Sequence, residues 1–355
     1  MGYFQIYVSD DFPLEEITFL GSEIERSKLF TAGYIAPKVG LTNPAGLIFA
    51  KEYEGIDTWI LPDRNLVSRI AKIAKLGTVG ADQTSRNALV VMSFCKAMDL
   101  NFEPSIAYHE LAHALGNQDA IDELSWFRGG DNHDTQEWLD LTLGRIPSLS
   151  AVTAVTAASP GNLAFPLHRW KRNYAAVLKI ATLELSALSP PEKSLALLDW
   201  MENKFVVAGP ALMFAQRYFA PNSSKRGLLK GLRSADRSKA IQGAKNAAWD
   251  ITHLSDFVKR VDEGVDQNIR YIFATADKLL GEIAPKLLIG NASGMQSEIQ
   301  SEMRGLWGEK DSIHISGKVV ELLELAQNHP TRRDRQLPVD EMINSLEREI
   351  CHWGP

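Results

Sequence analysis

The pattern of apolar and polar residues predicts, at two distant places in the chain, a short strand that runs directly into a helix. The first strand covers residues 58–61, and the apolar residues after Asp63 recur at helical spacing: Leu66, Val67, Ile70, Ile73 and Ala74. The second place has an amphipathic helix over residues 247–261, a strand over 270–274 and a helix opened by Asp277. This alternation of strands and helices predicts an α/β core.

Further elements are predicted between residue 1 and residue 114. Residues 3–8 and 46–50 have the composition of short strands, and Asn43-Pro-Ala-Gly46 supplies turn residues before the second of them. Helices are predicted over residues 86–98 and from Pro104-Ser105 to Ala114.

The middle of the chain, residues 135–245, has an almost wholly helical pattern broken at proline-containing segments. The residues after 290 are also helical in pattern, and residues 339–350 predict a docking helix, either for this chain or for a partner. The predicted domains are therefore N-terminal strands with the first part of the α/β core (1–134), a helical insertion (135–245), the second part of the core (246–290) and a helical C-terminal extension (291–355).

Composition restricts the setting in which we expect the protein to act. The 355-residue chain is 45% hydrophobic, which is enough for two or three domains with a substantial core. There is no segment of signal-peptide type at the N-terminus and no apolar run near the roughly 20 residues that span a bilayer. Cys95, in an apolar run, and Cys351 are the two cysteines, which favours a reducing cytoplasm. The net charge of −6 means that any binding of nucleic acid needs a local patch.

Four carboxylates occupy positions typical of a metal site in an α/β fold. Asp63 and Asp277 end the two predicted strands, Glu110 lies early in a helix, and Asp250 lies in the helix that leads into the second strand. Functional groups in open α/β sheets gather beyond the carboxyl ends of the strands, where helix N-termini also stabilise acids. Four acids at one edge would repel one another unless a divalent cation lay among them. Hard oxygen ligands select Mg²⁺ or Mn²⁺, which activates water and orients a phosphodiester.

These carboxylates lie in segments that resemble motifs of the PIN-like nuclease family. The segments are Ile60-Leu-Pro-Asp63-Arg-Asn65, Ser105-Ile-Ala-Tyr-His-Glu110-Leu, Ala248-Trp-Asp250-Ile and Phe273-Ala-Thr275-Ala-Asp277-Lys-Leu-Leu. The resemblance covers residues 55–115 and 245–290, and the long gap between Glu110 and Asp250 then requires a helical insertion. It implies a PIN-like parallel sheet, metal binding by Asp63, Glu110, Asp250 and Asp277, and support from Asn65 and Thr275.

The resemblance also implies metal-dependent cleavage of RNA. Toxin-like or defence-related nucleases of this kind often require an inhibitory protein partner, and the oligomeric state is left open. A third class of function stays open as well, in which a PIN-like module binds nucleic acid or protein without catalysis.

The segment His109-Glu110-Leu-Ala-His113 supports a different chemistry. Two histidines four residues apart share one face of a helix and are typical ligands of Zn²⁺, with Glu110 as the general base of a metallopeptidase. Gly116 and Asp119 extend the resemblance to the metzincin motif, with Asp in place of the third His. The next methionine is Met201, too distant for the Met-turn of that family. We prefer the nuclease interpretation.

Residues 225–245 form a basic segment that contains a single acid, Asp236. A basic stretch of this kind either contacts phosphates or is a solvated helix face. Arg169, Lys171 and Arg172, beside Trp170, are candidates to extend it with a stacking aromatic. The predicted contacts to RNA or single-stranded nucleic acid are Lys225, Arg226, Lys230, Arg233, Arg237, Lys239 and Lys245.

Overall fold

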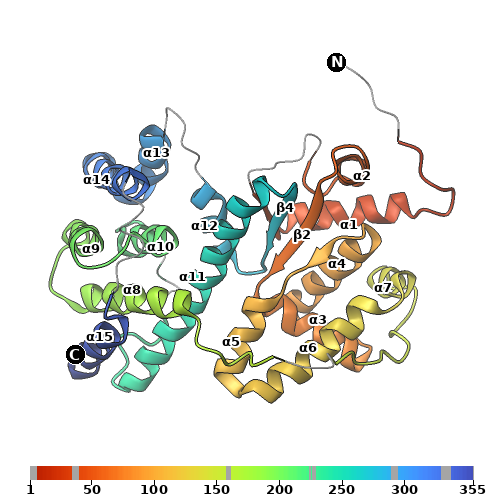
Figure 1. Ribbon diagram of the computed structural model, residues 1–355, viewed down its shortest axis with the longest axis horizontal. Helices are drawn as coiled ribbons and strands as arrows, with labels where there is room; N and C mark the ends of the chain where they lie inside the picture. Colours follow the sequence, from red (N-terminus) through yellow and green to blue (C-terminus); the bar gives the residue numbers. More distant parts are fainter. Residues whose placement is uncertain are drawn as a thin grey trace. The chain divides into compact units, whose positions relative to one another are not determined.

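The computed structural model describes residues 6–33, 40–156, 161–223, 225, 229–288, 295–328 and 337–354. The chain divides into two compact units, each built from two segments (Figure 1). The first, here called the α/β unit, comprises Met1–Phe165 and Asp256–Pro285. The second, the helical unit, comprises Pro166–Ser255 and Lys286–Pro355.

The sheet of the α/β unit has, in the described residues, four strands in the order β1-β4-β2-β3. Strand β2 (Asp57–Pro62) is parallel to β4 (Ile269–Ala274) on one side and to the short β3 (Asn101–Phe102) on the other. Strand β1 (Phe30–Ala32) is antiparallel to β4. The predicted α/β class and the predicted strands at 58–61 and 270–274 are confirmed.

One face of this sheet packs against helices formed by the first half of the chain. Their bounds are α1 Leu14–Arg26, α2 Pro44–Glu52, α3 Arg64–Leu76, α4 Gln83–Ala97, α5 Ser105–Leu115, α6 Asn117–Asn132 and α7 Thr135–Thr142. Ile60 and Ile272 point from the sheet into a fully buried cluster with Ile70 and Phe94. Asp63 and Asp82 begin α3 and α4 by accepting backbone N–H groups of the first turn, which explains where both helices start.

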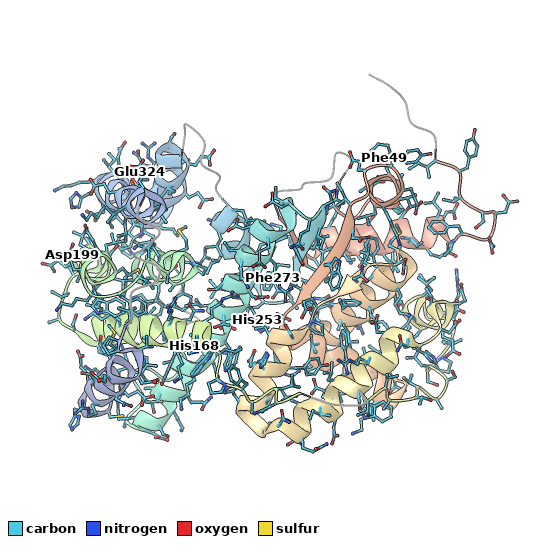
Figure 2. All side chains as sticks on the ribbon, in the orientation of Figure 1. Phe49, His168, Asp199, His253, Phe273 and Glu324 are labelled. Atoms are coloured by element: carbon cyan, nitrogen blue, oxygen red, sulfur yellow. The ribbon has the colours of Figure 1, made fainter. Side chains whose placement is uncertain are left out.

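The opposite face is covered by the last part of α11 (Arg237–Val265). The ring of Phe257 lies 5.6 Å from that of Phe273, which Figure 2 labels on β4. Gly33, just after β1, allows close approach, because a Cβ at this position would lie 2.7 Å from a methyl of Val261. Helix α11 is continuous over 29 residues, yet residues up to Ser255 belong to the helical unit and those from Asp256 onward to the α/β unit.

The helical unit contains α8 (His168–Leu185), α9 (Pro190–Asn203), α10 (Gly209–Phe219), α13 (Met295–Trp307), α14 (Glu309–Asn328) and α15 (Val339–His352). Helix α15 docks on α8 of its own chain. The Tyr174 hydroxyl donates to Oε1 of Glu347 at 2.6 Å, and the indole N–H of Trp353 donates to the carbonyl of Leu185 at 3.1 Å. The predicted helix over 339–350 is confirmed, and the structure gives its docking site.

Three local features differ from the sequence prediction. Residues 46–50 lie in α2 and not in a strand, because Asn43 caps this helix by accepting the Gly46 N–H at 3.0 Å and Pro44 fits its first turn. Of the strand predicted at 3–8, the first three residues lie outside the described part, and residues 6–8 have no regular structure. Helix α7 and the residues up to Phe165 group with the α/β unit, whereas the prediction placed 135–165 in the insertion.

Helix α12 (Lys278–Ile283) and a 3₁₀ helix (Ala284–Leu288) follow β4. Among the helices of the described residues, none has the length and apolar character required to cross a membrane.

Candidate active site at the carboxyl ends of the parallel strands

The carboxyl ends of β2 and β4 bring two of the predicted site residues to neighbouring positions. Pro62 pairs with Ala274 at the last position of the two parallel strands, so Asp63 and Thr275 leave the sheet at the same edge. The Asp63 N–H donates to the Ala274 carbonyl at 2.9 Å. The Thr275 hydroxyl donates to Oδ2 of Asp63 at 2.5 Å and accepts the Asp277 N–H at 2.9 Å. One hydroxyl therefore connects the Asp63 carboxylate to the backbone of Asp277.

Asp63 is held in one orientation inside the protein. Asp63 is only 2% exposed. Its Oδ1 accepts the Leu66 N–H at 2.8 Å, and its Oδ2 accepts the Thr275 hydroxyl. A buried carboxylate needs such donors, because an unsatisfied buried charge is strongly unfavourable. Helix α3 adds the positive end of its dipole.

Asp277, in contrast, is exposed and begins α12. Its Oδ1 accepts the N–H groups of Leu279 at 2.8 Å and Leu280 at 3.2 Å. Both acids are therefore helix N-caps, as many strand-ending aspartates are. The two acids therefore differ in their surroundings: the Asp63 carboxylate is buried and held by hydrogen bonds, whereas the Asp277 side chain is open to solvent.

Two further predicted residues belong to helices that begin at this edge. Glu110 is half-buried on α5, which follows β3, the neighbour of β2. Asn65 is exposed in the first turn of α3. The sequence prediction assigned the support of Asp63 to Asn65 and Thr275 together, and the structure shows the Thr275 hydroxyl donating to the Asp63 carboxylate.

Asp250 groups with the helical unit, whereas Asp63, Glu110 and Asp277 group with the α/β unit. The acid of α11 that belongs to the α/β unit is Asp256, which is 9% exposed. It precedes Phe257, whose ring packs on Phe273, so Asp256 lies level with the end of β4.

Glu103 and Arg260 accompany Asp256 on the α11 face of the sheet. Glu103 follows β3, its N–H donates to the Ile60 carbonyl at 2.9 Å, and its Oε1 accepts the Ser105 N–H at 3.2 Å. The Arg260 guanidinium lies 3.5 Å from Asp256 Oδ2 and 3.9 Å from Glu103 Oε2. Burial opposes the charge of Arg260, but the two carboxylates outweigh burial and raise its pKa.

Sequence reasoning missed this trio, although a signal was present. A helix rises about 1.5 Å per residue and a strand about 3.3 Å. Counting back along the helix from the turn before β4 places residues near 254–256, and not 250, level with the end of the strand. Glu103 was missed because β3 has only two residues, too few for a detectable alternation.

The histidines of the alternative zinc motif lie on one helix as the spacing predicts. His109 is half-buried, with Nδ1 at 2.7 Å from the Leu163 carbonyl. His113 is exposed, with Nδ1 at 2.8 Å from the carbonyl of His109. The helix ends at Gly116, which has a φ of 107°, and Asp119 lies exposed on the next helix, α6.

The described residues contain no group of three or more His, Cys, Asp and Glu side chains arranged to hold a metal ion. The structure therefore assembles neither the four predicted carboxylates nor the zinc set into one such group. Asp63 and Asp277 still offer carboxylate oxygens at this edge, which is the donor type that fits Mg²⁺ or Mn²⁺, and the Thr275 hydroxyl connects the Asp63 carboxylate to the backbone of Asp277. A cavity of about 180 Å³ lies at the other end of β2, where Asp57 and Thr58 line it.

The basic segment of the helical unit divides into engaged and exposed cations. Arg237 donates to the carbonyls of Leu232, Ser234 and Ile350, and its guanidinium lies 5.0 Å from the Trp353 ring, so it has a structural role. Lys230 and Lys239 are exposed, Lys245 is half-buried, and Arg226 lies outside the described residues.

The predicted extension of the basic segment is also engaged within the helical unit. Lys171 binds Asp340 at 2.8 Å. The Trp170 ring stacks on Tyr174 with centroids 4.9 Å apart, so it packs inside its own unit instead of forming an open stacking platform.

Comparison of the chain with protein-family models, with curated proteins and with solved structures gave no match.

Proposed function

We propose that the protein is a metal-dependent nuclease with a PIN-like α/β unit, and that RNA is its substrate. The observation that carries this proposal is the connection of Asp63 to Asp277 through Thr275, at the adjacent carboxyl ends of the parallel strands β2 and β4. This edge is where open α/β sheets place their functional groups. The mostly parallel sheet supports the PIN-like assignment, and a buried free thiol at Cys95 supports the cytoplasmic setting.

The residues at this edge have separate tasks in the proposed reaction. Asp63, fixed by the Leu66 N–H and the Thr275 hydroxyl, presents a preoriented carboxylate, and Asp277 offers an exposed one. Together with Glu110 and Asp256, which belong to the same α/β unit, they would hold Mg²⁺ or Mn²⁺. When bound, the ion would supply an activated water and neutralise the leaving oxygen of the phosphodiester.

The test is cleavage of a labelled RNA in the presence of Mn²⁺. We expect Asp63→Asn and Asp277→Asn each to lower the rate about a hundredfold or more, because each removes a charged oxygen ligand. Asn also caps helices, so the helix starts should persist in both variants. Asp82→Asn is the matched control, since Asp82 caps α4 through the Ser85 N–H at 3.0 Å but lies outside the proposed edge.

Equal activity in the wild type and in both edge variants would overturn the nuclease proposal. Near-stoichiometric zinc in the purified protein, lost in His113→Ala, would do the same in favour of the metallopeptidase. An inhibitory protein partner is tested by purifying the protein with and without any protein that co-purifies with it. A nuclease held inactive by such a partner should gain RNA-cleaving activity when the partner is removed.

A further inference from the structure

A buried carboxylate in the helical unit collects three cations. Glu184, near the end of α8, is 5% exposed. Its Oε2 lies 3.1 Å from Nζ of Lys193, and its Oε1 lies 3.0 Å from Nζ of Lys225 and 3.4 Å from Nη2 of Arg233. One negative charge cannot balance three positive ones, so this cluster has a surplus of positive charge.

The surplus positive charge of this cluster lies on its two exposed side chains. Lys193 is buried with Glu184, whereas the side chains of Lys225 and Arg233 are 43% and 65% exposed. Burial raises the pKa of Glu184, but the hydrogen bonds from Lys225 and Lys193 outweigh burial and lower it. Glu184 is therefore charged at neutral pH and holds the two exposed cations in place.

Both cations have binding capacity beyond Glu184. A guanidinium has five N–H donors in a planar fork, and a single oxygen shared with Lys225 does not accommodate them all. Lys225 also lies 5.2 Å above the Tyr218 ring, which restricts its side chain. Ser223, two residues before Lys225, has a buried hydroxyl oxygen without a hydrogen-bond partner in the described residues.

We propose that Lys225 and Arg233, preorganised by Glu184, bind a phosphate group of a single-stranded nucleic acid. A tetrahedral dianion or a phosphodiester matches a paired ammonium and guanidinium. The choice of nucleic acid as the source of the phosphate rests on the proposed nuclease function. The site belongs to the helical unit, whereas the carboxylate edge belongs to the α/β unit, and it selects two cations from a longer basic segment.

The experiment measures anisotropy of a labelled oligouridylate with the full-length protein in EDTA, over a series of salt concentrations, so that cleavage does not contribute. The test variant is Lys225→Gln with Arg233→Gln. The matched control is Lys230→Gln with Lys239→Gln, which removes the same charge from the same segment. For single strands each phosphate contact contributes about −0.7 to the slope of log affinity against log salt. Because both cations contact one phosphate, we expect the test variant to reduce the slope by about 0.7 and the control to leave it nearly unchanged.

Equal losses in the two variants would overturn the site in favour of diffuse electrostatic attraction. Loss of metal-dependent cleavage in Asp63→Asn together with equal losses here would overturn this inference alone. Absence of oligouridylate binding by the wild type, with metal-dependent cleavage of RNA intact, would also overturn this inference alone. Unlabelled RNA and vesicles of anionic lipid, added as competitors, identify the source of the phosphate. If the vesicles inhibit oligouridylate binding and unlabelled RNA does not, the proposal is overturned. Arg233→Gln alone, at an exposed position, repeats the test if the double variant does not fold.

Discussion

The hydroxyl of Thr275 joins two elements of the candidate site, and its removal is the most direct test of how that site is built. Thr275→Val keeps the shape of the side chain but removes both the hydrogen bond to Asp63 Oδ2 and the acceptor of the Asp277 N–H. Thr275 is 2% exposed and Asp63 is 2% exposed, so water does not readily replace either partner.

The expected magnitude follows from these contacts. Hydrogen bonds to charged groups contribute about 1.5–3 kcal/mol, and a buried group left without a partner costs about 1–3 kcal/mol. We therefore expect Thr275→Val to lower the free energy of unfolding of the α/β unit by about 2–4 kcal/mol. Thr275→Ser keeps the hydroxyl and loses one methyl group, which we expect to cost about 0.5–1.5 kcal/mol.

The assay is urea unfolding followed by circular dichroism, with the midpoint and the slope fitted for each variant. A lower midpoint at an unchanged slope reports a loss of stability. RNA cleavage by the same samples, assayed where all are folded, should fall more in the Val variant than in the Ser variant. If both variants have the same midpoint, the hydroxyl does not hold Asp63 and the proposed rigidity of this carboxylate is wrong.

Three further predictions concern other parts of the chain. Asp256→Asn should lower RNA cleavage at least tenfold, and more than Asp250→Asn, in a direct comparison of rates; the reverse order would favour the acid predicted from the sequence. The pKa of Glu184 is lowered in the folded protein, so its ion pairs stabilise the fold above about pH 5 and lose this contribution as the pH falls through the lowered pKa. In urea titrations between about pH 7 and pH 3, the wild type should therefore lose its stability advantage over Glu184→Gln. Arg237→Lys cannot reproduce the hydrogen bonds to the carbonyls of Leu232, Ser234 and Ile350, so it should destabilise the docked α15 by about 2 kcal/mol. Amide hydrogen exchange should become faster in residues 339–352 and stay unchanged in α3.

The parts of the fold that the sequence predicts correctly have strong local signals. Strand β2 is a largely apolar run followed directly by the capping acid Asp63 and the amphipathic helix α3, and β4 is followed three residues later by Asp277, which caps α12. Because parallel neighbours place their carboxyl ends together, these signals also predict that Asp63 and Asp277 share an edge.

Other features depend on long-range packing and have no clear local signature. Strand β1 has three residues and exists because β4 offers it a paired edge. Residues 46–50 are equally apolar as a strand or a helix, and the Asn43 cap decides between them. The position of Asp256 depends on the register of α11 against β4, which a single ring contact between Phe257 and Phe273 reveals in the structure.

The sheet order has a consequence for the time at which the protein becomes complete during synthesis. Strand β4 lies between β1 and β2, so these two early strands share no hydrogen bonds with each other. Both pair with a strand that begins at Ile269 and is synthesised much later. The hydrogen bond from Thr275 to Asp63 joins residues 212 positions apart. Domains that complete their sheets through such distant contacts fold late and slowly. A nascent chain that has not yet reached Asp277 therefore has an unfinished sheet and only one of its two strand-end carboxylates, which would keep the proposed nuclease inactive while it is still on the ribosome.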